Sequence, residues 1–483
     1  MKNGISGFSL GGMIFLLYIC TRIKHLMVML ERKFTSFLEH FLMEEPNKIL
    51  LVNGARQIGK SYLIRYVGQK LFAHFVEINL KEDAEGDKVF ADVHSTNDLY
   101  MRLSNFYSSP LGDNRDTLVF LDEIQSYPHL MTMLKFLNQE SRYRFIASGS
   151  QLGVALSQTP SVPLGSVTIE QMYPLDFEEF LWATGIGKNW IGNIRECFLQ
   201  EKSLDESTHN ILLKRFQYYL LVGGMPEAIN NYLADRNMTR VRQTHKDIHN
   251  LYRIDASQYD EDHKLKIRKI YDLVPSNLEN KKKRMVYKNI EGKKGKTFSD
   301  YADEFEYLTN SGVALEVSAI SNPRFPLVES EQKRLVKLYL NDVGLLTSLL
   351  YGLNVNAVLQ DIKSVNLGTV YESVVAQELA AHGFKLHYYD NKKKGEVDFL
   401  IDDHGKLNVL PIEVKSGKDY TQHSALTNFL ETPDYGINRA IVFSNERKVF
   451  DKRGVIYLPI YYCMFLNDDC HDEAVILPEL ELI

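Results

Sequence analysis

The sequence predicts an α/β protein, and two patterns in its N-terminal half carry this prediction. An apolar run at residues 48–53 is followed by the phosphate-loop pattern G-x-x-x-x-G-K-[ST] and then by a helix-like stretch at residues 61–69. Beyond this stretch, strand-like and helix-like segments alternate as far as about Tyr173. Such alternation is typical of a parallel sheet whose faces are covered by helices.

The phosphate loop consists of Gly54, Ala55, Arg56, Gln57, Ile58, Gly59, Lys60 and Ser61. Its two glycines let the backbone curl, so that N–H groups point at phosphate oxygens beside the positive N-terminus of a helix. Lys60 can reach the terminal phosphates of ATP, and the Ser61 hydroxyl can ligate Mg²⁺. A glycine turn before a helix is the alternative, and the strand in front of the loop favours nucleotide binding.

An acidic pair, Asp122 and Glu123, follows a second apolar run at residues 118–121, which is typical of a strand buried on both faces. We expect Asp122 to hold Mg²⁺ through water and Glu123 to orient or polarise the attacking water. An acidic pair after a strand is usually the start of a solvated loop, but the phosphate loop upstream favours the catalytic interpretation.

Small polar residues end the next short strand, at residues 144–150. We expect a hydroxyl of Ser148 or Ser150 to contact the γ-phosphate or the attacking water. A turn rich in serine and glycine is the alternative.

Five motifs occur in order along the chain: G-A-R-Q-x-G-K-S, F-L-D-E-I-Q, A-S-G-S, Y-P-L-D-F-E-E-F-L and L-V-G-G-M-P-E. From about Met29 almost to its end, the chain resembles a family of bacterial and archaeal P-loop ATPases of the AAA+ superfamily that carry a C-terminal domain of unknown function. The resemblance implies a doubly wound AAA+ core, an α-helical lid near residues 205–245, and ATP as the ligand. Many relatives have an arginine where this chain has Ser166. If that arginine senses nucleotide in relatives, this chain must use another, and the candidates are Arg56, Arg142 and Arg144.

In the middle of the chain, at residues 251–345, helix-like segments precede strand-like segments. The helix-like segments lie at 264–276 and 297–312, and the strand-like segments lie at 313–320 and 335–340. This order predicts a winged helix-turn-helix. The family resemblance implies the same assignment. Between residues 281 and 296 there are eight basic residues and one acid. Contact with DNA phosphates is one interpretation of this basic run. A solvated lysine-rich loop is the other, and winged helices also serve as protein–protein modules.

Near the C-terminus, the patterns predict a helix carrying Glu372 and two strands, one with Asp398 and one with Glu413 and Lys415. Side chains alternate along a strand, so Glu413 and Lys415 share a face. The three carboxylates offer the hard oxygen ligands that Mg²⁺ prefers, and Lys415 can place or activate the water for metal-assisted phosphodiester cleavage.

This order of elements resembles the PD-(D/E)xK nuclease core, which implies a restriction-endonuclease-like α/β domain. The chain departs from the pattern where Glu396 and Val397, and no proline, precede Asp398. A surface ion pair between Glu413 and Lys415 is the structural alternative, and some nuclease-like domains keep the fold and only bind.

The net charge of −6 gives no overall attraction to nucleic acid, so DNA binding must depend on local patches. The four cysteines have no metal-binding spacing, which suits a reducing cytoplasm. The apolar run at residues 8–20 is short for a membrane span, so no stable membrane insertion is expected. We expect the natural protein to begin at Met27 or Met29, with a membrane anchor at residues 1–28 as the alternative.

Together these patterns predict a cytoplasmic, Mg²⁺-dependent ATPase associated with DNA. Its parts are an AAA+ core and lid at residues 29–250, a winged helix at 251–345, and a nuclease-like domain at 346–483 that is a candidate deoxyribonuclease. DNA is expected to bind through residues 281–296 and the C-terminal domain, and self-association stays open. The alternative is a signalling or regulatory ATPase switch whose winged helix and C-terminal fold bind partners or DNA without cleavage.

Overall fold

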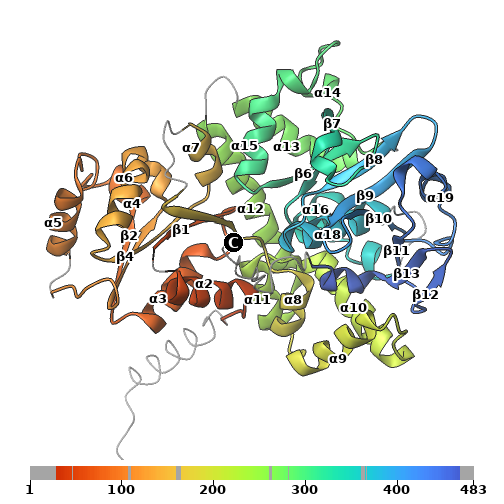
Figure 1. Cartoon of the computed structure of the whole chain (residues 1–483), viewed down its shortest axis with the longest axis horizontal. Coiled ribbons are helices and arrows are strands. Elements are labelled where there is room, and N and C mark those ends of the chain that lie inside the picture. The colour runs from red at the N-terminus through yellow and green to blue at the C-terminus, as the bar shows by residue number, and fades with distance from the viewer. Residues whose placement is uncertain are drawn as a thin grey trace, which may run out of the picture.

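The computed structural model describes residues 29–467 except 46, 107–109, 159–164, 260–263, 281, 361–364 and 366. The segment at residues 1–28 and Lys281 of the basic run therefore lie outside the described residues. Figure 1 shows two sheets at opposite ends of the molecule with helices between them.

The N-terminal sheet has five strands in the order β2-β3-β4-β1-β5, and neighbouring strands are parallel. The three inner strands are buried at every residue, as expected of continuous apolar runs in a parallel sheet. The strands are β1 (Ile49–Asn53), β2 (His74–Asn79), β3 (Thr117–Asp122), β4 (Arg144–Gly149) and β5 (Val167–Gln171).

Helices cover both faces of this sheet. Leu50 and Val52 of β1 belong to one apolar core with α2 and α3, whereas Ile49 and Leu51 belong to a second core with α5 and α6. The helices are α2 (Lys33–Glu44), α3 (Lys60–Leu71), α4 (Leu80–Glu85), α5 (Thr96–Phe106), α6 (Pro128–Glu140) and α7 (Leu152–Gln158). The alternation along β1 confirms the predicted α/β core with helices on both faces of a parallel sheet.

A helical layer follows, and Figure 1 shows α8, α11 and α12 between the two sheets. The helices are α8 (Phe177–Ala183), α9 (Lys188–Leu199), α10 (Glu206–Val222), α11 (Pro226–Asp235), α12 (Met238–Tyr259), α13 (Lys264–Leu278), α16 (Val343–Tyr351), α17 (Asn356–Leu359) and α18 (Gly368–Ala381). In the described part of the chain, none of the helices combines the length and the apolar character needed to cross a membrane.

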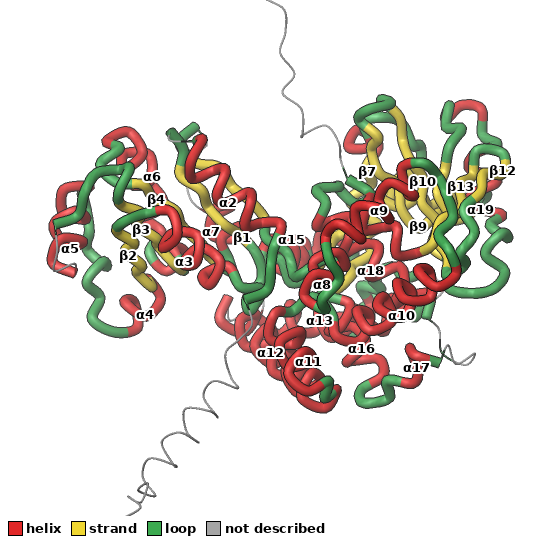
Figure 2. Tube along the Cα trace, turned by 90° about the horizontal axis from the view of Figure 1, so that it is seen from below, coloured by secondary structure: helices red, strands yellow, loops and turns green. Residues whose placement is uncertain are grey.

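The C-terminal sheet has eight strands in the order β12-β13-β11-β10-β9-β8-β6-β7. They are β6 (Ala314–Ile320), β7 (Glu331–Leu340), β8 (His387–Asn391), β9 (Gly395–Asp403), β10 (Asn408–Val414), β11 (Ala440–Ser444), β12 (Phe450–Lys452) and β13 (Val455–Pro459). Shorter helices at its periphery are α14 (Lys288–Glu291), α15 (Ala302–Asn310) and α19 (Ser424–Leu430). Figure 2 shows α18 crossing beneath this sheet.

The hairpin expected within a winged helix is the edge of this same sheet. Strand β6 pairs antiparallel with β7 and parallel with β8, where Ser318 faces His387. The sheet therefore continues across the predicted domain boundary between residues 345 and 346, and the winged helix at 251–345 is not confirmed. A hairpin pattern in a sequence predicts that its two strands pair with each other. It does not predict which other strand of a sheet lies next to the hairpin.

A buried carboxylate ties the helical layer to the C-terminal half. Asp342 caps α16, and its Oδ1 accepts a hydrogen bond from the Leu345 N–H at 2.9 Å. Its Oδ2 accepts a hydrogen bond at 2.5 Å from the N–H of Gly224, just beyond α10. Burial raises the pKa of Asp342 to about 6, although backbone N–H groups and Arg242 oppose the rise. The ionised carboxylate therefore costs stability at neutral pH.

Replacing Asp342 with Asn keeps an acceptor for the helix and removes the titrating group. An unfolded Asp titrates near 3.8, so between this pH and about 6 the folded wild type binds more protons and its free energy of unfolding falls as the pH rises. From pH 4 to pH 7 we expect Asp342→Asn to gain about 2 kcal/mol relative to the wild type, measured by urea denaturation. Asp87→Asn, at an exposed site, is the matched control. Parallel pH profiles for wild type and Asp342→Asn would contradict this account.

Candidate functional site

The phosphate loop connects β1 to α3 at the carboxyl edge of the N-terminal sheet. Gly54 and Gly59 have φ values of 145° and 94°, and Gln57 has a φ of 67°. A Cβ atom on Gly54 would lie 2.4 Å from the carbonyl oxygen of Met172, so only glycine fits at this position. The loop thus leads directly into the N-terminus of α3, where backbone N–H groups lack helical partners and can bind an anion.

The Lys60 amine lies inside this loop. Its Nζ donates hydrogen bonds to the carbonyl oxygens of Gly54 at 2.7 Å and Ala55 at 2.8 Å. Burial lowers the pKa of Lys60 to about 8, against the opposing attraction of Glu123 and Asp122. A buried amine that donates only to backbone carbonyls is well placed to bind an incoming phosphate more strongly.

Asp122 ends β3 beside the loop and is held by two hydroxyls. Its Oδ2 accepts a hydrogen bond from the Ser61 Oγ at 2.7 Å, and its Oδ1 accepts hydrogen bonds from the Ser148 Oγ and from the Glu123 N–H. Burial raises the pKa of Asp122, while the two serine hydroxyls lower it. Ser61 and Asp122 thus bring two hard oxygen donors together, as a Mg²⁺ site requires.

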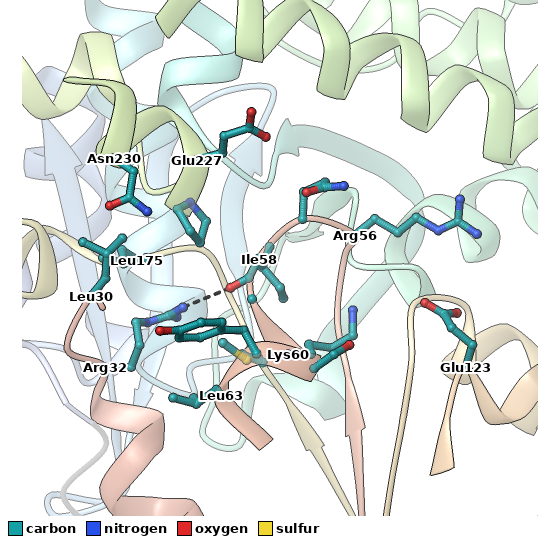
Figure 3. A pocket seen from close by; sticks show the side chains of 16 residues that line it. Leu30, Arg32, Arg56, Ile58, Lys60, Leu63, Glu123, Leu175, Glu227 and Asn230 are labelled. Atoms are coloured by element: carbon teal, nitrogen blue, oxygen red, sulfur yellow. Dashed lines mark hydrogen bonds between the residues drawn. The ribbon is translucent and has the colours of Figure 1, made fainter. Parts of the chain in front are cut away.

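Glu123 follows Asp122 in the left-handed backbone region, with φ 54°. Its Oε2 accepts hydrogen bonds from the Gln125 Nε2 and, at 3.2 Å, from the Ser150 Oγ. Figure 3 shows Glu123 on a strand end beside the loop that carries Lys60. A hydroxyl of Ser148 or Ser150 was expected to contact the γ-phosphate or the attacking water. In the structure, the Ser148 hydroxyl donates a hydrogen bond to Asp122 and the Ser150 hydroxyl donates one to Glu123.

Among the three candidate arginines, Arg56 lines a cavity next to the rest of the phosphate loop. Its Nε donates to the Ser150 Oγ at 3.2 Å, and its Nη1 forms an ion pair with Asp255 of α12. Arg142 instead lies over the rings of Tyr100 and Tyr143, at 4.8 and 5.4 Å from their centroids.

Arg144, the third candidate, acts at the end of α2. It donates to the carbonyl oxygens of Glu45 at 3.0 Å and Leu42 at 2.7 Å. It thus satisfies carbonyl groups left free at the end of a helix. Its role is structural, which leaves Arg56 as the candidate placed to contact a bound nucleotide.

A cavity of about 390 Å³ lies between the phosphate loop and α11 (Figure 3). This volume is within the range of small-molecule sites. Its far wall is apolar with two polar side chains, and consists of Leu30, Met172, Leu175, Pro226, Glu227 and Asn230. Sequence reasoning did not single out these residues, although Pro226 and Glu227 belong to the motif L-V-G-G-M-P-E.

Arg32, also missed, fixes the floor of the cavity. Its guanidinium donates to the carbonyl oxygens of Ile58 at 3.2 Å and Tyr173 at 2.7 Å, and pairs with Glu179 at 3.0 Å. The acid-rich motif at residues 176–179 was a signal that a basic partner would be needed.

The C-terminal half brings together the predicted nuclease-like residues. We call Glu372, Asp398 and Glu413 the carboxylate cluster. Glu413 pairs with Lys415 at 2.6 Å, and its Oε2 is buried without a hydrogen-bond partner. Burial raises the pKa of Glu413 to about 8, and Asp398 adds to the rise while Lys415 opposes it.

The other two members of the carboxylate cluster already have partners. Asp398 Oδ2 accepts a hydrogen bond from the Val414 N–H at 2.8 Å. Glu372 forms an ion pair with Lys283 and accepts a hydrogen bond from the Tyr339 hydroxyl at 3.3 Å. Within the described residues, no group of three or more His, Cys, Asp or Glu side chains has an arrangement that could hold a metal ion.

The basic run does not form one solvated face. Lys283 points into the carboxylate cluster, and Arg284 pairs with Asp390 at 2.9 Å. Four other lysines of the run are exposed: Lys282, Lys288, Lys293 and Lys294. The inward-pointing members of the run could not be recognised from composition, because their partners, Glu372 and Asp390, lie in a distant part of the sequence.

Three family models match the chain. The first is described as an AAA domain and matches residues 46–181. A domain of unknown function (DUF8612) matches residues 213–357, and another domain of unknown function (DUF4143) matches residues 367–463. A search of curated proteins found no match.

Matches among the solved structures include an ATPase and a branch migration motor. The Walker-type ATPase PABY2304 of Pyrococcus abyssi is 14% identical, with 67% of this chain and 96% of that chain covered and a TM-score of 0.41. The Thermotoga maritima RuvB Holliday junction branch migration motor is 12% identical, with 62% and 90% covered and a TM-score of 0.27. The AAA-domain match, together with the five-stranded parallel sheet, supports a P-loop ATPase in the N-terminal part of the chain.

Proposed function

We propose that this protein binds and hydrolyses ATP with Mg²⁺ at the phosphate loop, in the cytoplasm. The observation that carries the proposal is the buried Lys60 amine inside a glycine-dependent loop, beside the hydrogen-bonded Ser61 and Asp122. The cavity against α11 provides room for the nucleoside part. The apolar far wall suits a base, and the loop N–H groups suit the phosphates.

Each residue of the site then has a defined task. The Ser61 hydroxyl would ligate Mg²⁺, and Asp122 would hold it through water. A bound Mg²⁺ would supply positive charge that compensates the negative charge developing on the phosphates during transfer. Lys60 exchanges its two carbonyl acceptors for phosphate oxygens. Glu123, held by Gln125 and Ser150, would orient the attacking water and accept its proton.

Lys60→Ala removes the amine that compensates the phosphate charge, so we expect ATP binding to be lost. Glu123→Gln keeps the shape of the side chain but cannot accept a proton, so ATP should still bind while turnover falls on the order of 10²- to 10⁴-fold. Binding is measured with a fluorescent ATP analogue and turnover by phosphate release. If Lys60→Ala hydrolysed ATP at the wild-type rate, the proposed site would be wrong.

Arg56 is the side chain that we propose contacts the γ-phosphate. Its guanidinium sits between Ser150 and Asp255, and Arg56 lines the same cavity as Lys60. A bound triphosphate carries more negative charge than the single carboxylate of Asp255 and is therefore the stronger anionic partner. If Arg56 bound a phosphate in place of Asp255, the ion pair between the phosphate loop and α12 would be broken.

Arg56→Gln should lower the rate of ATP hydrolysis on the order of 10²- to 10³-fold, because a preorganised positive charge is lost from the developing transition state. Arg142→Gln is the matched control, since Arg142 contacts tyrosine rings away from the cavity. Steady-state phosphate release measures both variants. If the two substitutions lowered the rate equally, Arg56 would not be the residue that contacts the γ-phosphate.

For the C-terminal half, we propose a nuclease-like domain that associates with DNA and, in the described conformation, does not cut it. The helix–strand–strand order of Glu372, Asp398, Glu413 and Lys415 supports the nuclease-like assignment. The ion pairs of Glu372 and Glu413 with lysines favour binding without cleavage, because paired carboxylates are poor metal ligands. The exposed lysines of the basic run supply contacts for phosphates.

Replacing Lys288, Lys293 and Lys294 together with Ala should weaken duplex DNA binding and lower the slope of log affinity against log salt by about 1 per lysine. Fluorescence anisotropy at several salt concentrations measures this. Replacement of three exposed lysines elsewhere, Lys135, Lys202 and Lys246, changes net charge equally and is the control. If both triple variants lost DNA affinity equally, DNA binding would depend on overall charge and not on the basic run. If the wild type nicked plasmid DNA in the presence of Mg²⁺, the proposal of binding without cleavage would be contradicted.

A further inference from the structure

Two residues of α12 contact Arg56 of the phosphate loop. The Tyr252 hydroxyl donates a hydrogen bond to the Arg56 carbonyl oxygen at 3.4 Å, and the Asp255 carboxylate forms an ion pair with the Arg56 guanidinium. Tyr252 and Asp255 are three positions apart in the sequence, so they share one face of the helix. One face of α12 therefore binds both the backbone and the side chain of a residue in the phosphate loop.

The ion pair between Arg56 and Asp255 is mostly buried. The two side chains are 18% and 10% exposed, respectively. Solvent and salt screen such a pair less than a pair on the surface, and the loss of one partner leaves the other charge poorly compensated. Arg56 is therefore expected to leave Asp255 only in exchange for another anion.

The ion pair holds the Arg56 guanidinium at the edge of the proposed ATP site. Arg56, Lys60 and Glu123 line the same cavity, whereas Asp255 does not line it. Figure 3 shows the Arg56 guanidinium directed away from Lys60. Its Nε donates to the Ser150 Oγ at 3.2 Å, and the Ser150 hydroxyl donates to Glu123 at 3.2 Å. Arg56 thus lies beside the proposed catalytic glutamate, but its charge is paired with α12.

We propose that the Arg56–Asp255 ion pair is an autoinhibitory contact that distinguishes ATP from ADP. This inference rests on the proposed contact of Arg56 with the γ-phosphate and adds its regulation. The γ-phosphate of ATP competes with Asp255 for the guanidinium, so that ATP breaks the ion pair and releases the end of α12 from the phosphate loop. ADP has no γ-phosphate and leaves the ion pair intact. ATP binding therefore includes the cost of breaking the ion pair, whereas ADP binding does not.

The first test compares the affinities of the wild type and Asp255→Asn for AMPPNP, a non-hydrolysable ATP analogue, and for ADP, both with Mg²⁺. Asp255→Asn keeps the size of the side chain and removes its charge. We expect the affinity for AMPPNP to rise on the order of tenfold and the affinity for ADP to stay unchanged, as measured by isothermal titration calorimetry. Asp247→Asn, at an exposed site on the same helix, is the matched control and should change neither affinity. Equal gains for the two nucleotides would contradict the proposal, because the gain would then not depend on the γ-phosphate.

A second substitution tests whether Asp255 acts through Arg56. In the Arg56→Gln background, Asp255→Asn should no longer raise the affinity for AMPPNP, because the guanidinium for which the two anions compete is absent. A gain that persisted in this background would show that Asp255 repels the nucleotide by its charge alone, and the autoinhibitory contact would be wrong.

Hydrogen exchange of the wild type gives a test that does not depend on the folding of a variant. AMPPNP should speed the exchange of backbone amides at residues 252–259 of α12, and ADP should not. Equal exchange with the two bound nucleotides would overturn the autoinhibitory contact and leave the proposed ATP site intact. If neither nucleotide bound to the folded wild type, the proposed function would fail together with this inference.

Discussion

The hydrogen bonds of the buried Lys60 amine to two backbone carbonyls are the interaction on which the N-terminal half depends. A desolvated cation without a bonded carboxylate is costly, and the loop tolerates it because its backbone curls around the amine. The curl requires glycine at residue 54, where the Met172 carbonyl approaches closely. The parallel sheet beneath supplies the rest, since the carboxyl ends of β1, β3 and β4 bring the loop, Asp122 and Ser148 to one edge.

The ATP site and the C-terminal half are physically continuous. The Tyr252 hydroxyl donates to the Arg56 carbonyl oxygen at 3.4 Å, and Asn341 Nδ2 donates to that hydroxyl at 3.3 Å. Asn341 precedes Asp342, which binds the backbone beyond α10. One apolar core also extends from α2 through α18 to the end of the described chain. Arg56 is thus joined by hydrogen bonds through Tyr252 to Asn341, next to the helix cap at Asp342.

Local patterns carried most of what could be predicted from the sequence. The phosphate loop, the acidic pair and the strands of the parallel sheet are set by short runs whose chemistry depends on immediate neighbours. Strand alternation predicted that Glu413 and Lys415 share a face, whereas Asp398 was expected on the neighbouring strand and Glu372 on a helix. Long-range partners were not accessible in this way, and they include the pairing of β6 with β8, the Arg56–Asp255 ion pair and the Lys283–Glu372 ion pair. In the basic run, composition indicated a solvated or DNA-binding face, but two of its members form ion pairs with Glu372, which is buried, and Asp390, which is partly buried.

The account rests on a triphosphate binding in the loop around Lys60. Isothermal titration calorimetry with Mg²⁺ and a non-hydrolysable ATP analogue tests this most directly. The structure predicts a saturable heat of binding with one nucleotide per chain, which disappears when the analogue is replaced by adenosine. The absence of any heat with folded protein would contradict the central claim.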